Sequence, residues 1–230
     1  MRKKLSAIII FIGVLFIFIP IIGNLYTSYK QDEMVRQFKR NITNPELSAN
    51  KSNPYKEYNQ LERAFASEKE TGSADPGNNP RSQAELSEIT EKDTDSYQDQ
   101  KMLGIIKVSK ISIELPIVEG VEQRSLRTGI GHIPGTALPG EAGNCVLAGH
   151  RSYTFGKFFN QLDKLEKGNE ININNGYKSY TYKVFKTYVV SPDDTSILEE
   201  NKNENIITLV TCTPIYVASH RLIVVAKLVE

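Results

Sequence analysis

Two cysteines and three histidines are the side chains of this sequence that could act as a nucleophile and a proton carrier. Cys212 follows an apolar-rich run at 206–211, and His150 follows a shorter apolar run at 144–148. Runs of this kind predict buried strands, so both side chains would emerge where a strand opens into a loop. If the two strands are neighbours, the thiol and the imidazole share one rim of the fold. An imidazole that takes the proton of a thiol creates a thiolate nucleophile, so this pair predicts acyl-transfer chemistry.

Acyl transfer also needs a group that stabilises the negative charge developing on the substrate's carbonyl oxygen. Arg221 opens the last predicted strand, nine residues after Cys212, and a hairpin-like return would bring its guanidinium back to the thiol. Arg151 is the competing candidate. It directly follows His150, and neighbouring side chains of an extended chain point to opposite sides. We therefore expect Arg221 to be the third residue of the site.

The other candidates have structural interpretations. Cys145 lies deeper in its predicted strand than Cys212, which favours a small core residue over a disulfide partner. His132 lies in the turn-like sequence Gly-His-Ile-Pro-Gly at 131–135, which favours a hydrogen-bonded structural histidine. No paired histidine or cysteine spacing suggests zinc, so we expect no metal and no cofactor. Several carboxylates lie in predicted loops, where acidic residues are more often solvated than bound to calcium. They are Glu141, Asp193, Asp194, Glu199 and Glu200.

The elements that would position these residues begin near residue 101, where short apolar runs alternate with turn-forming residues. Pro116 interrupts one run, Asn175-Gly176 predicts a hairpin with a type I′ turn, and apolar spacing over 155–165 predicts a helix. A further helical turn is expected at 125–127. Seven or eight strands with only short helices predict a mainly β fold, a closed or nearly closed antiparallel-rich barrel. The predicted strands cover 104–108, 111–115, 144–148, 171–174, 177–190, 206–211 and 221–229.

Composition divides the chain into three parts, 1–26, 27–100 and 101–230. Residues 1–26 contain three cations followed by 22 uncharged residues, enough for a helix of about 33 Å. This pattern predicts an N-terminal transmembrane helix that stays as a signal-anchor, with a cleaved signal peptide as the alternative. Residues 27–100 are mostly polar and predict a stalk, in which 30–40 and 61–65 could be helical. The net charge of +1 offers no broad basic surface for nucleic acid.

Three segments resemble the signature motifs of the sortases, the cysteine transpeptidases of Gram-positive cell surfaces. The resemblance covers 101–230 and implies an eight-stranded sortase-type β-barrel with His150, Cys212 and Arg221 as its catalytic triad. The order of the three residues along the chain also matches. The matching segments are TLVTC at 208–212, which resembles the TLxTC signature, LAGHR at 147–151 and HRLIV at 220–224.

The resemblance also implies a function. A sortase cleaves an LPxTG-like sorting signal between Thr and Gly, holds the acyl group on its cysteine and passes it to an amine. The expected partners are surface proteins that carry such a signal, together with a peptidoglycan precursor or cross-bridge amine. The enzyme would be a single-pass protein of the cell membrane with its catalytic domain outside the cell.

The sequence is most similar to class D sortases. Class C, the pilus-polymerising class, typically has a lid with an Asp-Pro-aromatic motif and a second membrane helix at the C-terminus. Here Asp75-Pro76 precedes Gly77, and the chain ends at Glu230 directly after the last predicted strand. Class C remains one alternative, and a thiol endopeptidase without transpeptidation is another. A non-catalytic surface adhesin is the third, although no sorting signal of its own is present in the sequence.

Overall fold

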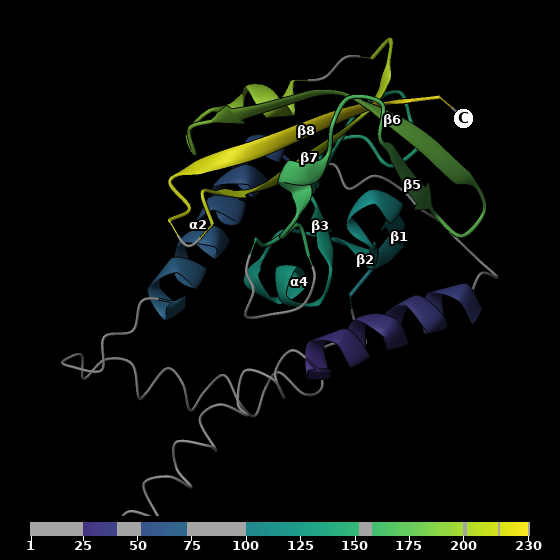
Figure 1. Cartoon of the computed structure of the whole chain (residues 1–230), viewed down its shortest axis with the longest axis horizontal. Helices are drawn as coiled ribbons and strands as arrows, with labels where there is room; N and C mark the ends of the chain where they lie inside the picture. The colour runs from purple at the N-terminus through teal and green to yellow at the C-terminus, as the bar shows by residue number, and fades with distance from the viewer. Residues whose placement is uncertain are drawn as a thin grey trace, which may run out of the picture.

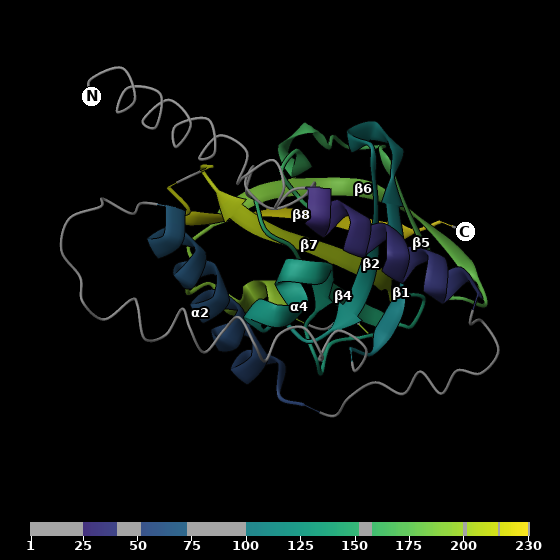
Figure 2. The same cartoon turned by 90° about the horizontal axis from the view of Figure 1, so that it is seen from below.

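Eight strands close into a barrel in the order β1-β2-β3-β4-β7-β8-β6-β5. Figures 1 and 2 show the fold from two directions, with α2 on the outside of the strands. This arrangement comes from a computed structural model that describes residues 25–40, 52–72, 100–151, 158–199, 202–215 and 217–229. The predicted closed, mainly β barrel is confirmed. The strands are β1 Met102–Val108, β2 Ile113–Glu119, β3 Ile130–His132, β4 Gly143–Ala148, β5 Glu170–Asn174, β6 Ser179–Val190, β7 Asn205–Thr213 and β8 His220–Leu228.

Helical elements are short within the barrel region and longer before it. An α-helix covers residues 25–40, and the helix α2 that follows it has 19 residues. Helix α2 covers Pro54–Gly72 and precedes β1. The shorter helical segments lie between strands, and they are η2 Ser109–Ile111, α4 Gln123–Thr128, η3 Leu162–Lys164 and η4 Thr195–Leu198, where η marks a 3₁₀ turn.

Strand alternation divides the buried residues into two cores. On β4, Cys145 and Leu147 face the barrel interior with the first core, whereas Val146 and Ala148 face outwards. All six residues of β4 are nevertheless buried, because α2, η4 and α4 contribute to the outer core on its outward face. Cys212 belongs to this second, outer core. The predicted nucleophile therefore lies beneath α2 rather than inside the barrel.

Helix α2 is a departure from the polar stalk expected over 27–100. Its buried residues Tyr58, Leu61 and Phe65 are spaced by three and four positions and pack on the barrel. The sequence pattern indicated only one turn at 61–65, because the apolar stripe is narrow and the rest of the helix is strongly polar. The stalk interpretation is thus wrong for residues 54–72.

The predicted membrane anchor falls almost entirely on residues 1–24, which lie outside the described residues. Within the described ranges, no helix is long and apolar enough to cross a membrane. The expected short helix at 30–40 is present as part of the helix over 25–40. Lys39 anchors that helix to the barrel through an ion pair with Glu114 of β2, with Nζ and Oε1 2.6 Å apart.

Three local expectations are corrected. Strand β2 runs through Pro116 because pairing with β3 begins only at Ile117, so on that side no ladder hydrogen bond requires the missing N–H. The hairpin of β5 and β6 closes over four residues, 175–178, rather than through a two-residue turn. Over 158–165 the chain forms a short 3₁₀ turn instead of the predicted helix, and 155–157 lie outside the described residues.

Candidate active site

Strand β7 brings the three predicted site residues together because it lies between β4 and β8. It pairs with β4 in parallel from Gly143↔Asn205 to Ala148↔Val210, and the residue numbers differ by 62 throughout. His150 and Cys212 also differ by 62, so each lies two residues past the last pair. On the other side of β7, the antiparallel register places Arg221 directly opposite Cys212. One strand thus positions all three side chains.

Backbone contacts fix the segment that carries His150. The N–H of Gly149 donates to the carbonyl of Val210 at 3.1 Å, and the Thr211 hydroxyl donates to the Gly149 carbonyl at 2.7 Å. The N–H of Phe159 donates to the carbonyl of His150 at 3.0 Å. A Cβ at Gly149 would lie only 2.7 Å from a methyl carbon of Ile130, so the close packing here requires glycine.

Helix α2 covers the site with an aromatic ring. The exposed fractions are 3% for His150, 5% for Cys212 and 4% for Arg221. The ring of Phe65 lies 5.6 Å from the His150 imidazole, and the Arg221 guanidinium lies 5.2 Å from the centre of the same ring. Phe65 therefore contacts two of the three site residues, which shields the site from solvent.

Helix α2 also supplies a carboxylate to Arg221. Nε and Nη2 of Arg221 donate to the two oxygens of Glu62, with Nε 2.8 Å from Oε1. Nη1 donates to the carbonyls of Ala218 and His220 at 3.1 and 2.9 Å. Burial acts to lower the pKa of Arg221, but Glu62 and the nearby Cys212 outweigh it and raise the pKa. The guanidinium is therefore charged and already held by protein acceptors.

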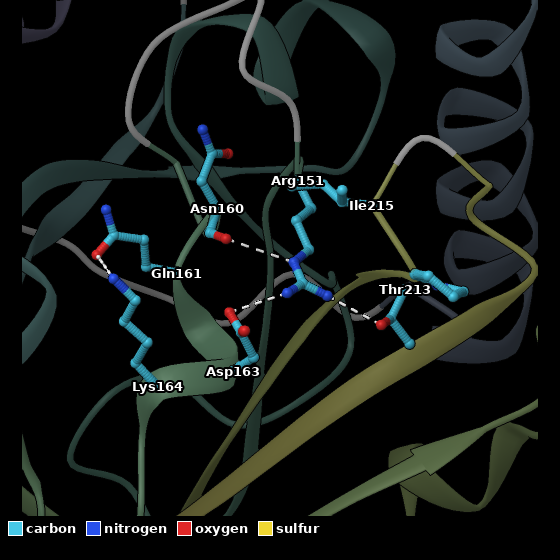
Figure 3. A pocket seen from close by; sticks show the side chains of 8 residues that line it. Arg151, Asn160, Gln161, Asp163, Lys164, Thr213 and Ile215 are labelled. Carbon is cyan, nitrogen blue, oxygen red and sulfur yellow. Dashed lines mark hydrogen bonds and ion pairs between the residues drawn. The ribbon is translucent and has the colours of Figure 1, made fainter.

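Arg151, the competing candidate, lies away from the Arg221 position. Its guanidinium donates to Thr213 Oγ1 at 2.9 Å and pairs with Asp163 at 2.9 Å (Figure 3). Successive strand residues point to opposite faces, so Thr213 projects away from the face that carries Cys212. These residues line a cavity of about 370 Å³, which the close-up also shows. The geometry therefore keeps Arg221 as the candidate oxyanion group.

The other cysteine and histidine have structural surroundings. Burial raises the pKa of Cys145, whose thiol lies in the barrel interior. His132 is buried at the end of β3, with Nδ1 3.0 Å from a Glu119 oxygen and Nε2 3.0 Å from the Ala137 carbonyl. Both structural interpretations are confirmed. Among the described residues, no group of three His, Cys, Asp or Glu side chains could hold a metal ion.

A buried polar network lies further back along β4 and β7, away from the strand ends that carry the site. The Thr208 hydroxyl donates to Oδ1 of Asn144 at 2.7 Å, and Nδ2 of Asn144 donates to the carbonyls of Ile197 at 2.8 Å and Glu199 at 3.2 Å. This network ties β4 and β7 to η4, which packs against α2. Sequence reasoning missed Glu62 and Phe65 as residues that contact the site. Only the narrow apolar spacing at 61–65 gave a signal for the last of them.

Comparison with known proteins identifies sortases, both by a family model and by similar sequences. A family model described as a sortase domain matches residues 106–229. Sortase D of Bacillus subtilis is 39% identical over 111 residues, which cover 48% of this chain and 54% of that protein. The chain therefore spans about half the length of this relative.

Two solved structures are similar as well. The Clostridium perfringens sortase D5 transpeptidase has a TM-score of 0.52 and 38% identity, over 56% of this chain and 79% of that chain. Sortase C1 of GBS pilus island 1 has a TM-score of 0.60 and 27% identity, over 87% of this chain and 92% of that chain.

Proposed function

This chain belongs to the sortase family, the cysteine transpeptidases, and we propose from that premise that it cleaves an LPxTG-like sorting signal and attaches the acyl product to an amine. The observation that carries the proposal is the register of β7, which places Cys212 beside the His150 segment and opposite Arg221. A thiol, an imidazole and a guanidinium are the groups that this reaction needs.

The reaction proceeds in two acyl transfers. His150 takes the proton of Cys212, and the thiolate attacks the carbonyl carbon of the signal's Thr. Arg221 donates hydrogen bonds to the oxyanion of the tetrahedral intermediate. The Thr–Gly C–N bond then breaks, and the proton on His150 passes to the leaving Gly amine. A thioester to Cys212 remains.

The second transfer resolves the thioester. The incoming amine attacks the thioester carbon and gives a proton to His150, while Arg221 again stabilises the oxyanion. The C–S bond breaks, the new amide is released, and the proton returns to Cys212. Water in place of the amine would give hydrolysis, which is the thiol-endopeptidase alternative.

The proposed setting is the cell surface. Residues 1–26 would anchor the chain in the membrane, and the residues between the anchor and α2 would join it to the catalytic domain. That domain would comprise the barrel at 101–230 together with the packed helix α2, outside the cell. The partners would be surface proteins with a C-terminal sorting signal and an amine of a peptidoglycan precursor or cross-bridge.

A class D role is supported by the likeness to sortase D of Bacillus subtilis and to the Clostridium perfringens sortase D5. One observation favours the class C alternative. The likeness to sortase C1 of GBS pilus island 1 extends over 87% of this chain, well beyond the 124 residues of the family match. A pilus-polymerising enzyme would join one protein subunit to another rather than to the cell wall.

The test is product analysis by mass spectrometry. The protein is incubated with an LPxTG-type peptide library, with and without diaminopimelate- or glycine-type amines, beside its Cys212→Ala variant. We expect cleavage after Thr, an amide product that increases with amine concentration, and no product with the variant. Cleavage that never yields an amide would support the endopeptidase. Cleavage by Cys212→Ala would refute the proposed mechanism.

A further inference from the structure

We propose that Arg151 is a positioning residue that ties the loop carrying His150 to the end of the strand carrying Cys212. The inference rests on the proposed roles of His150 and Cys212. The sequence made Arg151 a candidate for binding the oxyanion. The role inferred here is a different one, because Arg151 would align the reacting groups without contacting the substrate.

The guanidinium of Arg151 connects its own segment to the turn at 160–163 and to the end of β7 (Figure 3). Nη1 donates to Thr213 Oγ1 at 2.9 Å, and Nη2 lies 2.9 Å from Asp163 Oδ1 in η3. Nε donates to the carbonyl of Asn160 at 3.4 Å. The Arg151 side chain is 9% exposed, so its guanidinium is largely buried, whereas the Asp163 side chain is 52% exposed and its ion pair borders solvent.

The register explains why this connection matters. Sheet pairing between β4 and β7 ends at Ala148↔Val210, two residues before His150 and Cys212. Past that point, the Thr211 hydroxyl bonds the Gly149 carbonyl, and Arg151 bonds Thr213. These side-chain contacts lie immediately before and after the His150–Cys212 pair. They keep the segments that follow β4 and β7 aligned at the reacting groups, where the pairing of the two strands has already ended.

Lysine could not replace this arginine. The three contacts leave from three nitrogens of a planar fork and reach acceptors on different segments. A single ammonium on a flexible stem presents no such fork. Loss of the tie would let the imidazole and the thiol drift apart, and a displacement of about 1 Å can reduce the rate on the order of 10²-fold.

The test uses the full chain with Arg151→Lys, Arg151→Ala, Thr213→Val and Thr213→Ser. Lys164→Ala is the matched control, because Lys164 lines the same cavity and its ammonium donates to Gln161 rather than to β7. We expect both Arg151 variants to lower kcat on the order of 10²-fold with KM within about threefold. Thr213→Val should lower kcat by a smaller factor. Thr213→Ser, which keeps the hydroxyl, and Lys164→Ala should both have the kcat of the wild type.

A second readout separates positioning from a merely structural role. The rate of Cys212 alkylation by iodoacetamide is measured against pH in a Cys145→Ala background. A lost His150–Cys212 alignment should change the shape of this profile, whereas partial unfolding would change only its amplitude. An unchanged profile with kcat within twofold of wild type would overturn the inference. Turnover by Cys212→Ala would instead overturn the proposed function itself.

Discussion

At the scale of single residues, the two thiols of the chain differ by which face of a strand they occupy. Cys145 points into the barrel interior, where burial raises its pKa, and Cys212 lies on the outer face of β7 opposite Arg221. Because a thiol with a raised pKa remains protonated at neutral pH, Cys145 cannot supply a thiolate nucleophile.

Substitution separates the two cysteines. Cys212→Ala should abolish cleavage and thioester formation, because no other thiol faces the His150 segment among the described residues. Cys145→Ala should leave turnover within several-fold of wild type. Peptide cleavage assays and intact-mass detection of the acyl-enzyme measure both effects. The reverse pattern would contradict the assignment of the nucleophile.

Arg221 makes a second prediction at this scale. Removal of one oxyanion donor typically costs about 10²–10³ in rate, or about 3–4 kcal/mol. Arg221→Ala, and largely Arg221→Lys because lysine lacks the forked geometry, should therefore lower kcat far more than they raise KM. Steady-state kinetics give the two parameters separately. A change confined to KM would show that Arg221 binds substrate without stabilising the transition state.

At the scale of secondary-structure elements, the Asn144 network holds the β6–β7 connection against the barrel. Its amide donates to the carbonyls of Ile197 in η4 and of Glu199 just after it, and it accepts from Thr208 of β7; the contacts with Ile197 and Thr208 are buried. Since an unsatisfied buried polar group costs about 1–3 kcal/mol, the network links the position of η4 to the stability of the sheet.

Substitutions at Asn144 should show this link. Asn144→Ala removes the partner of three groups and should lower the free energy of unfolding by about 2–4 kcal/mol. Thr208→Val removes one hydroxyl and should cost less. Urea unfolding followed by circular dichroism measures both. Equal stability of Asn144→Ala and wild type would show that water replaces the lost amide.

At the scale of the whole molecule, the described structure joins α2 to the barrel through a shared core. Leu61 is fully buried among residues of β4, β7 and β8, and the composition break near residue 100 therefore does not coincide with the edge of the packed structure. Whether 101–230 folds alone depends on how the outer core tolerates the loss of α2.

We expect a chain that starts near Ser96 to retain the barrel but to unfold at a lower temperature than one that starts near Ser52. Its exposed outer face contains apolar residues that α2 otherwise covers, which favours aggregation. In the full chain, Leu61→Ala should cost about 2–5 kcal/mol if α2 and the barrel unfold together. Calorimetry of the three proteins tests this. Identical melting temperatures would show that α2 unfolds independently of the barrel.

The sequence by itself determined the barrel class and the three motif residues, because both depend on local signals. Alternating apolar runs predict strands, and the TLVTC, LAGHR and HRLIV segments lie at strand ends. The separation of 62 residues between His150 and Cys212 could also be read from the sequence. Its meaning depended on β4 and β7 being parallel neighbours, which no local pattern encodes.

Tertiary structure alone decided what surrounds those residues. Helix α2 is polar in sequence, and its narrow apolar stripe becomes stabilising only when the outer face of β4 and β7 is present to receive it. The pairing of Glu62 with Arg221 spans 159 residues, and that of Arg151 with Thr213 spans 62. Contacts between residues so far apart follow from how the elements pack, which is why the sequence identified the three candidate groups but not the residues that cover and align them.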